Sequence, residues 1–323
     1  MSPQLLEVLR QLSHETFLSG EVVAKRLGCS RATVNNVMRE AAASGVAIHA
    51  VHGRGYRLAR PLSWLDPNTL MAAFAGRGVT LRCFDHLPST NTHLLQWAHS
   101  GAPHRALVVA EAQGEGRGRR GRTWHARLGG SLLFSMLWRS NRSVAELSGL
   151  SLAVGASLVD SLRRMGLARA VVKWPNDILV DEAKLAGVLI ELSGDMLGPS
   201  AAVIGVGINV LGGEALAGEI GQAVTDVQRH VGAIDRNALL LALVSGMDAG
   251  LHRFERGGFA GFRAEWQGLH AHQDRVVRIQ GGDGEPVIGR AIGVDDNGAL
   301  LLDTALGVCR FHAGEVSLRT EAE

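Results

Sequence analysis

One stretch near the middle of the chain constrains the fold more than any other: four arginines and three glycines alternate over residues 116–122. Apolar runs typical of β-strands lie on both sides, at residues 106–110 and 131–138. Arginine offers planar, permanently charged donors that suit phosphate and carboxylate, and glycine lets the backbone approach the bound group closely. A loop of this composition between core strands indicates an anionic ligand held by a rigid scaffold.

Three interpretations of this arginine–glycine loop compete. A solvated basic turn, or a nucleic-acid patch of the RGG type, is the most general, because arginine-rich runs usually reflect electrostatics. Gly116, Gly118 and Gly121 also match the G-x-G-x-x-G spacing of dinucleotide-binding loops. That motif requires a following helix and an acidic residue about 20 positions on, whereas residues 123–130 lack helical periodicity and Asn141 takes the place of the acid. The third interpretation, a dedicated site for a small anionic molecule, is the one that the rest of the chain favours.

The composition limits the number of domains, the kind of partner and the cellular compartment that we expect. A length of 323 residues with 46% hydrophobic side chains suits two or three domains. The net charge of +2 does not indicate nucleic acid, so any DNA contact must be local. Cys29, Cys83 and Cys309 are isolated, which suits a reducing cytosol and offers no zinc spacing. With no signal-peptide pattern and no long uninterrupted apolar run, we expect a cytoplasmic protein without a membrane segment and without a protein-ligated metal.

Lysine is rare in this chain. Thirty of the 33 basic residues are arginine, and the three lysines are Lys25, Lys173 and Lys184. Because a compact ammonium and a wide guanidinium are not interchangeable at a site, the neighbouring Lys173 and Lys184 are functional candidates. The alternative is that both lysines lie on the surface by chance.

Residues 1–60 form a predicted unit of their own. After two short helical segments, Ser30 is a good N-cap for a third helix with apolar residues at positions 34, 37, 38 and 41. Two apolar runs, 46–51 and 56–58, then predict a β-hairpin wing. This unit carries eight arginines and lysines against four glutamates, so we interpret it as a winged helix-turn-helix that binds DNA. Its candidate DNA-binding residues are Arg31, Thr33, Asn35, Asn36, Arg39 and, in the hairpin turn, Arg54.

The remaining chain divides into a linker over residues 61–68, a mixed α/β domain over 69–270 and a small all-β barrel or sandwich over 271–323. The overall class is therefore α+β and multidomain. In the central part the pattern predicts an amphipathic helix over residues 148–165 and another over 239–254. Short strands are expected at residues 171–172, 178–180, 185–192 and 201–206, and C-terminal strands at 276–279, 287–294, 299–302 and 308–311.

Four further motifs lie at the ends of predicted strands or helices. They are Ser89-Thr90-Asn91, Lys173-Trp174-Pro175-Asn176-Asp177, Lys184-Leu185-Ala186-Gly187 and Gly205-Val206-Gly207-Ile208-Asn209. Each has a structural alternative; the first, for example, is an ordinary helix cap. A carboxylate, two lysines, four arginines and several glycine turns, all at strand ends, instead predict one ligand site.

The sequences GRGRRGRTW, KWPND, KLAG and GIN, in this order after an STN, resemble those of biotin protein ligases. The N-terminal helix-turn-helix makes the chain similar to the bifunctional type, which is both biotin operon repressor and biotin–[acetyl-CoA-carboxylase] ligase. The likeness spans nearly the whole chain. It implies a central domain of the biotin/lipoate ligase type and an SH3-like C-terminal barrel. Lipoate ligases share the catalytic fold but lack GRGRRGR.

The resemblance implies a reaction in two steps. The carboxylate of biotin attacks the α-phosphate of ATP, which gives biotinoyl-5′-AMP and pyrophosphate, and a lysine of the acceptor protein then displaces AMP. It implies catalytic roles for Lys184, Arg119 and Arg117, and a role for Asp177 in orienting the incoming lysine or Mg²⁺. Magnesium would arrive with ATP, largely ligated by water.

The same resemblance assigns the binding residues. Those for biotin are Ser89, Thr90, Asn91, Gln113, Gly116, Arg117, Gly118, Arg119, Trp124, Lys184, Gly187 and Leu189. Those for ATP and the adenylate are Arg119, Arg120, Arg122, Lys173, Asn176, Gly207 and Asn209.

The implied partners are the biotin carboxyl carrier protein of acetyl-CoA carboxylase, operator DNA and, with adenylate bound, a second copy of the chain joined edge to edge. This requires an exposed edge strand in the central domain. The sequence departs from the family at Pro88, where a polar residue is usual, and at residues 221–225, which contain no tryptophan to pack on the adenine. The alternative function is a biotin-sensing transcription regulator without ligase activity.

Overall fold

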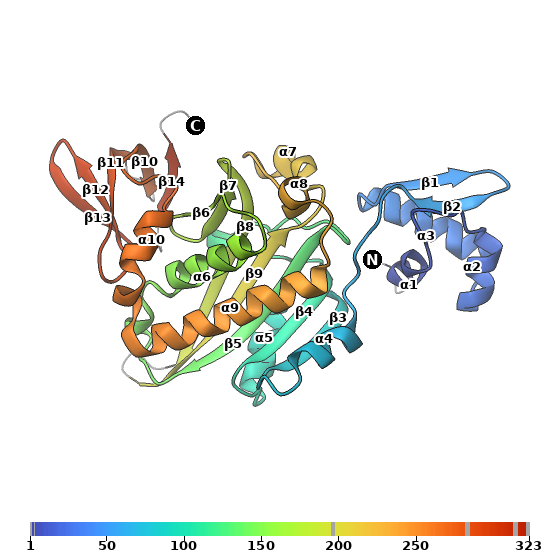
Figure 1. The fold of residues 1–323 in the computed structure, drawn as a ribbon, viewed down its shortest axis with the longest axis horizontal. Helices are drawn as coiled ribbons and strands as arrows, with labels where there is room; N and C mark the ends of the chain where they lie inside the picture. Colours follow the sequence, from blue (N-terminus) through green and yellow to red (C-terminus); the bar gives the residue numbers. More distant parts are fainter. Residues whose placement is uncertain (1, 3, 195–197, 282–284, 313–315, 321–323) are drawn as a thin grey trace.

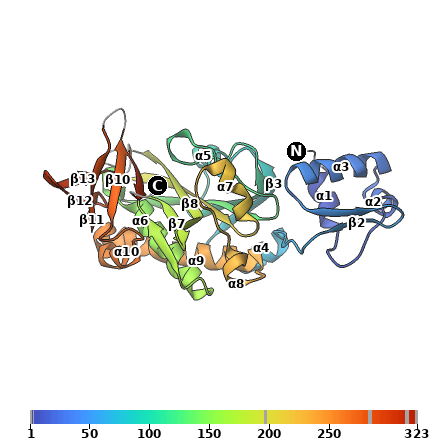
Figure 2. The ribbon, with the colours of Figure 1, turned by 90° about the horizontal axis from the view of Figure 1, so that it is seen from above.

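The computed structural model describes residues 2, 4–194, 198–281, 285–312 and 316–320. The chain forms three units in a row. The helix-turn-helix lies at one end, a large sheet covered by helices lies in the middle, and a small sheet lies at the other end (Figures 1 and 2).

The N-terminal unit is the predicted helix-turn-helix with its hairpin. Ser19 and Ser30 cap two of the helices by accepting backbone N–H bonds from Val22 and Thr33. The interior is formed by the apolar positions that the helical spacing selected, including Val34 and Val37. Its elements are α1 (Leu5–Arg10), α2 (Gly20–Leu27), α3 (Arg31–Ala43) and the antiparallel strands β1 (Ile48–Val51) and β2 (Gly55–Leu58).

The central unit is built on one seven-stranded mixed sheet. Its strands, in spatial order, are β3 (Thr80–Leu87), β4 (Ala106–Gln113), β5 (Ser131–Ser140), β9 (Ser200–Asn209), β8 (Ala183–Gly194), β7 (Asp177–Val180) and β6 (Ala170–Lys173). Only the β3–β4 pair is parallel among these neighbours. The strands on either side of the arginine–glycine loop, β4 and β5, are themselves neighbours, so both ends of the loop are fixed in the sheet.

Helices cover both faces of this sheet. Leu107 and Val109 of β4 belong to the core that includes α6 and α9, whereas Val108 and Ala110 pack in a second core with Leu94 of α5. This alternation follows the two-residue period of a strand buried on both faces. The helices are α4 (Pro67–Phe74), α5 (Thr90–His99), α6 (Leu150–Arg164), α7 (Ala217–Ile220), α8 (Val227–Val231), α9 (Arg236–Gly257) and α10 (Arg263–Leu269), with short 3₁₀ turns at Arg119–Gly121, Ala145–Leu147, Gly213–Leu216 and Phe259–Gly261.

The helix α6 differs from the prediction. An amphipathic helix was expected, but 11 of its 15 residues are buried, because it packs against both the sheet and α9 (Figure 1). By length and composition alone the stretch Ala145–Arg164 could cross a membrane, yet 67% of its apolar 18-residue window is buried inside the protein. It is a core helix of this fold.

The C-terminal unit is a five-stranded antiparallel sheet in the order β13-β12-β11-β10-β14. Four of its strands match the four predicted apolar runs, and β14 was not predicted. The strands are β10 (Val276–Gly281), β11 (Val287–Val294), β12 (Leu300–Thr304), β13 (Gly307–Phe311) and β14 (Val316–Thr320). Trp174 Nε1 donates to the carbonyl of Gly298 at 3.1 Å, which joins this sheet to the central unit beside the KWPND turn.

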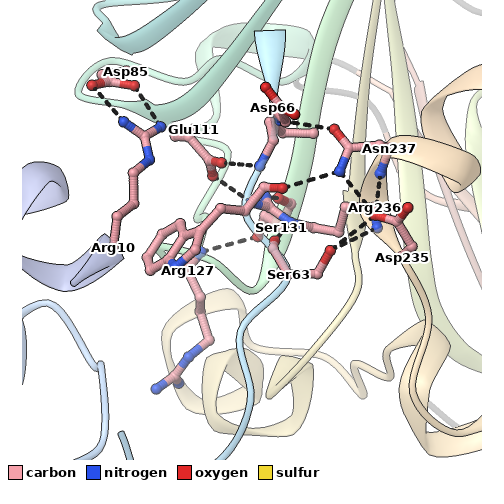
Figure 3. Close-up of polar contacts among 12 residues, drawn as sticks. Arg10, Ser63, Asp66, Asp85, Glu111, Arg127, Ser131, Asp235, Arg236 and Asn237 are labelled. Atoms are coloured by element: carbon pink, nitrogen blue, oxygen red, sulfur yellow. Dashed lines mark hydrogen bonds and ion pairs between the residues drawn. The ribbon is translucent and has the colours of Figure 1, made fainter. Parts of the chain in front are cut away.

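A buried ion pair fixes the linker between the first two units (Figure 3). Arg236, at the start of α9, lies 2.5 Å from Glu111 of β4, and neither side chain has more than 1% exposure. Arg236 also donates to the carbonyls of Ser63 and Ser131, each at 2.6 Å, and Glu111 accepts the backbone N–H of Leu65 at 2.5 Å. The linker is therefore held against the two strands that carry the arginine–glycine loop.

Candidate functional site

Most of the predicted ligand-binding residues line one hollow of about 730 Å³, a size that suits a small molecule and a nucleotide together. It lies where the arginine–glycine loop and the KWPND turn meet strands β8 and β9. The predicted residues that line it are Ser89, Thr90, Asn91, Gln113, Arg117, Gly118, Arg119, Arg120, Arg122, Trp124, Lys173, Asn176, Asp177, Lys184, Gly187, Leu189 and Gly207. Gly116 and Asn209 were predicted as well but are not among its lining residues.

The arginine–glycine loop is folded back on itself like a hairpin. The N–H of Trp124 donates to Gly116 at 2.8 Å, and the N–H of Gly118 donates to Arg122 at 2.7 Å. A side chain at Gly116 would meet the Trp124 carbonyl 2.8 Å from its Cβ. Glycine at position 116 therefore allows the loop to fold back on itself, and it does not line the hollow.

One end of the hollow carries uncharged polar groups. The oxygen Oε1 of Gln113 accepts from the backbone N–H of Thr90 at 2.6 Å and lies 2.9 Å from its hydroxyl. Behind them, the Ser135 hydroxyl lies 2.7 Å from the Thr90 hydroxyl and 2.6 Å from Asn91 Oδ1. This end can hydrogen-bond an uncharged amide or urea.

Arg117 lies beside this polar end. Its Nη2 donates to the Thr92 hydroxyl at 3.0 Å and to Glu191 of β8 at 3.1 Å. Glu191 and Ser135 are two members of this cluster that sequence analysis missed. Glu191 lies outside the recognisable motifs, and the serine is one of several in an apolar strand.

The other end carries cations. Lys184 Nζ lies 2.8 Å from Asp177 Oδ1, and both side chains are mostly buried. Arg119 Nη1 donates to Asn176 Oδ1 at 3.2 Å, while Asn176 is itself anchored to Val188 of β8 by a 2.8 Å bond. The structure thus brings the arginine loop, the KWPND turn and the KLAG strand together as the sequence predicts.

Arg119 has a donor that nothing in the described part of the chain uses. Its Nη2 is buried without a hydrogen-bond partner, and burial lowers the pKa of its guanidinium. An unmet buried donor is costly, and an anionic ligand would satisfy it. This feature therefore suits an anionic ligand in the hollow.

Trp124 lies across the strands at the floor of the hollow. A Cβ on Gly207 would fall 2.4 Å from the Trp124 ring, so the ring requires glycine at that position of β9. The Lys184 ammonium lies 5.7 Å from the ring centroid, and the indole Nε1 is buried without a partner among the described residues. The ring thus forms an apolar wall next to the cationic end.

The segment at residues 221–225 closes the hollow although it contains no tryptophan. Ala223 accepts the N–H of Lys184 at 2.8 Å, and Thr225 donates to the Lys184 carbonyl at 2.9 Å. Asn209 donates weakly to that same carbonyl at 3.4 Å, and its Oδ1 is buried without a partner in the described residues. The backbone of Lys184 is therefore fixed from both sides.

The donor set suits magnesium that arrives with ATP rather than a metal cage. No group of three or more acidic, histidine or cysteine residues with metal-binding geometry occurs in the described ranges. Asp177 is the carboxylate at the cationic end, and it is already paired with Lys184. Mg²⁺ commonly keeps several waters and binds one carboxylate plus substrate phosphates, which fits this arrangement.

The candidate DNA-binding residues lie on the N-terminal unit, far from the hollow. Arg31, Asn35, Asn36 and Arg39 are exposed on α3, and Arg54 is exposed in the hairpin turn. Thr33 is half-buried and its hydroxyl lies 2.8 Å from that of the capping Ser30. Residues of both the helix and the hairpin are thus available at the surface.

Comparison with known proteins agrees with this arrangement. Residues 4–57 match a model of a helix-turn-helix domain, 83–209 that of the biotin/lipoate A/B protein ligase family, and 273–319 that of the biotin protein ligase C-terminal domain. The chain is 34% identical to the bifunctional ligase/repressor BirA of Escherichia coli, over 98% of this chain and 97% of the relative, and 28% identical to that of Bacillus subtilis over 97% of each. Its fold is similar to the biotin protein ligase of Aquifex aeolicus in complex with biotin and ATP, with a TM-score of 0.65 and 29% identity over 75% of this chain and 99% of that one. The chain belongs to the biotin protein ligase family and has the architecture of its bifunctional ligase/repressor members.

Proposed function

We propose that the hollow is where this ligase joins biotin to ATP and then transfers biotin to an acceptor lysine. This assignment rests on one observation: uncharged polar groups and cationic groups lie at different ends of the hollow. Uncharged hydrogen-bonding groups around Thr90 and Gln113 lie at one end, and Lys184 with the unmet donor of Arg119 lies at the other. Biotin has the matching division, with an uncharged ureido ring at one end and a carboxylate at the other.

In the first step a carboxylate oxygen of biotin forms a bond to the α-phosphorus of ATP, and the bond to pyrophosphate breaks. Two anions must approach, so fixed cations that hold both groups supply much of the catalysis. Lys184 is the compact cation for the space between carboxylate and phosphate, and Arg119 is the planar donor for the phosphate oxygens. Arg120, Arg122 and Lys173 line the same hollow and suit the remaining phosphates. Asp177 keeps the Lys184 ammonium in place before the substrates bind.

In the second step the amine of the acceptor lysine attacks the acyl carbon of the adenylate, and AMP leaves. The amine loses one proton to solvent as the amide bond forms, and the Asp177 carboxylate, which lines the hollow, is the group that would orient the amine. Magnesium, when bound to ATP, neutralises phosphate charge, and Asp177 and Asn176 are the residues near enough to the cationic end to hold its waters. The acceptor that we propose is a biotin carboxyl carrier protein of acetyl-CoA carboxylase, in the cytoplasm.

Biotin-dependent exchange of labelled pyrophosphate into ATP tests the enzyme assignment. Lys184→Ala and Arg119→Ala should each lower the exchange rate about 100-fold or more, because each removes a cation at the developing charge. Lys25→Ala, an exposed lysine of α2, is the matched control and should leave the rate unchanged. If the wild-type chain catalysed no exchange but biotin still altered its binding to DNA, the chain would be a biotin-sensing regulator without ligase activity.

For the regulatory function we propose that the adenylate-loaded chain dimerises and then represses transcription through residues 1–60. The second half of β8 is a suitable edge for the dimer contact, because β7 pairs with β8 only between residues 183 and 187. Beyond that point one edge of β8 lacks a strand partner among the described residues, and its Leu192 is 41% exposed. A DNA footprint with and without biotin plus ATP, at fixed salt, tests the proposal; an unchanged footprint would contradict it.

We also propose residues 61–68 as the boundary segment between the DNA-binding and catalytic domains, and residue 271 as the start of the C-terminal domain. The buried anchoring of Ser63 and Leu65 supports the first boundary. The parallel bridge between Val172 and His270 supports the second, since it joins residue 270 to the central sheet shortly before β10 begins.

A further inference from the structure

The N-terminal unit is docked against the central unit as well as joined to it by the linker. Arg10 of α1 pairs with Asp85 of β3 at 2.7 and 3.0 Å (Figure 3). Ala112 and Leu128 of the central unit belong to the same hydrophobic core as the helices α1, α2 and α3, and they are 7% and 8% exposed. Both charged and apolar contacts therefore hold residues 1–60 in place.

Arg127 contacts the point where the two candidate DNA-binding elements meet. These elements are α3 and the hairpin of β1 and β2, and Gly45 lies in the short connection between them. The Nη2 of Arg127 donates to the carbonyl of Gly45 at 2.9 Å. A Cβ at position 45 would fall 2.6 Å from Nη2, and the φ of Gly45 is +81°. The close approach of the arginine and the left-handed backbone both require glycine there.

The backbone of Arg127 is fixed in the central unit. Its N–H donates to the hydroxyl of Ser131, the first residue of β5, at 3.0 Å. Its carbonyl accepts from Gly130 at 3.0 Å, and the carbonyl of Gly130 accepts from Leu211, just after β9, at 2.9 Å. The side chain of Arg127 thus extends from a turn that is bonded to the central sheet. Its bond to Gly45 therefore relates the orientation of α3 and the hairpin to that of the sheet.

This relation matters for a dimer that binds DNA. The two half-sites of an operator lie about 34–36 Å apart, or a multiple of that distance. In the proposed dimer the central units join through β8, so the spacing of the two N-terminal units is set only if each keeps its orientation on its own central unit. A unit that swings on residues 61–68 would fit a half-site in only a fraction of its orientations, and the affinity would fall by that fraction.

We propose that Arg127 is a positioning residue for DNA binding: its bond to Gly45 orients α3 and the hairpin on the central unit at the spacing that paired half-sites require. This inference rests on the proposed function of the chain as a dimeric repressor. Arg127 is not among the residues that line the hollow, so its loss should weaken DNA binding and leave pyrophosphate exchange unchanged.

The test measures the affinity of the chain, with biotin and ATP present, for two DNAs. One is the segment protected in the footprint, and the other is the same segment with five base pairs inserted at its centre. Five base pairs turn one half-site to the opposite side of the duplex, so the wild-type chain should lose about 100-fold or more in affinity. Arg127→Ala should bind the protected segment about 10-fold more weakly. The insertion should then cost this variant less than about 10-fold, because a swinging unit adapts to the new spacing.

Arg77→Ala is the matched control. Arg77 also donates to a backbone carbonyl, that of Ala73 at 2.8 Å, but within the central unit, so its loss should change neither affinity. An unchanged affinity of Arg127→Ala for the protected segment would overturn the proposal. So would an equal loss on both DNAs, since this would indicate a direct contact between Arg127 and a DNA phosphate. Absence of an adenylate-dependent footprint in the wild-type chain would instead refute the proposed repressor function, so the two failures are distinguishable.

Discussion

The ion pair of Arg236 and Glu111 allows a quantitative test of how the linker is held (Figure 3). Glu111→Gln keeps the shape of the side chain but leaves a guanidinium that is 0% exposed without its counter-charge. Removing one partner of a buried pair typically costs about 3–5 kcal/mol, because the remaining charge stays out of water. For a unit of roughly 200 residues, each kcal/mol lowers Tm by about 2–4 °C, so the central unit should melt roughly 6–20 °C earlier.

The chain contains a natural comparison for this measurement. Arg10 forms a two-bonded pair with Asp85 of β3, with distances of 2.7 and 3.0 Å, but the two side chains are 30% and 52% exposed. Arg10→Ala should cost at most about 1 kcal/mol, since exposed pairs contribute little. Calorimetry of both variants completes the test. A Tm loss for Glu111→Gln no larger than that for Arg10→Ala would refute the reasoning.

Three further outcomes follow from the geometry. Burial lowers the pKa of His270 to about 3 and that of His272 to about 4, so below a pH of about 6.5 the unfolded chain binds protons that the folded chain does not. As the pH is lowered from there toward the folded pKa values, urea titrations should show the free energy of unfolding falling by up to about 1.4 kcal/mol per pH unit for each histidine. A constant free energy of unfolding between about pH 6.5 and 5 would contradict this. Gly207→Ala places a Cβ 2.4 Å from the Trp124 ring, so it should displace the indole at a cost of about 1–3 kcal/mol, visible as a shift in tryptophan fluorescence and a lower Tm. Leu192→Lys puts a charge on the part of β8 whose edge lacks a strand partner among the described residues, and it should abolish adenylate-dependent dimerisation in sedimentation experiments while pyrophosphate exchange continues. An undiminished dimer would exclude this edge.

Much of the fold could be predicted because its signals are local. Serine caps and apolar spacing identify α2 and α3, and short apolar runs bounded by turns identify the strands of the central and C-terminal sheets. The motifs of the site also converge as expected, since each lies where a strand begins or ends. The helix α6 shows the limit of the pattern, because its Ser157 and Ser161 are buried against glycines of α9 rather than exposed on a polar face.

What could not be predicted depends on register between distant segments. Glu111 and Arg236 are 125 residues apart, and Arg117 and Glu191 are 74 apart. A charged residue alone favours exposure, so neither Glu111 nor Arg236 is expected in a core. Likewise Ser135 is one of several serines near apolar runs, and only the alignment of β5 beside α5 gives it Thr90 and Asn91 as neighbours.

The buried Arg236 and the half-buried Arg119 differ in how completely their guanidinium groups are hydrogen-bonded. Arg236 uses its Nε, Nη1 and Nη2 in hydrogen bonds to Ser63, Ser131 and Glu111, so each of its three side-chain nitrogens has a partner within the fold. Arg119 uses Nη1 on Asn176, but its buried Nη2 meets no partner in the described chain. An unmet buried donor costs about 1–3 kcal/mol. If Arg119 binds the anion as we propose, the ligand would complete its hydrogen bonds and should therefore order the arginine–glycine loop as well as bind to it.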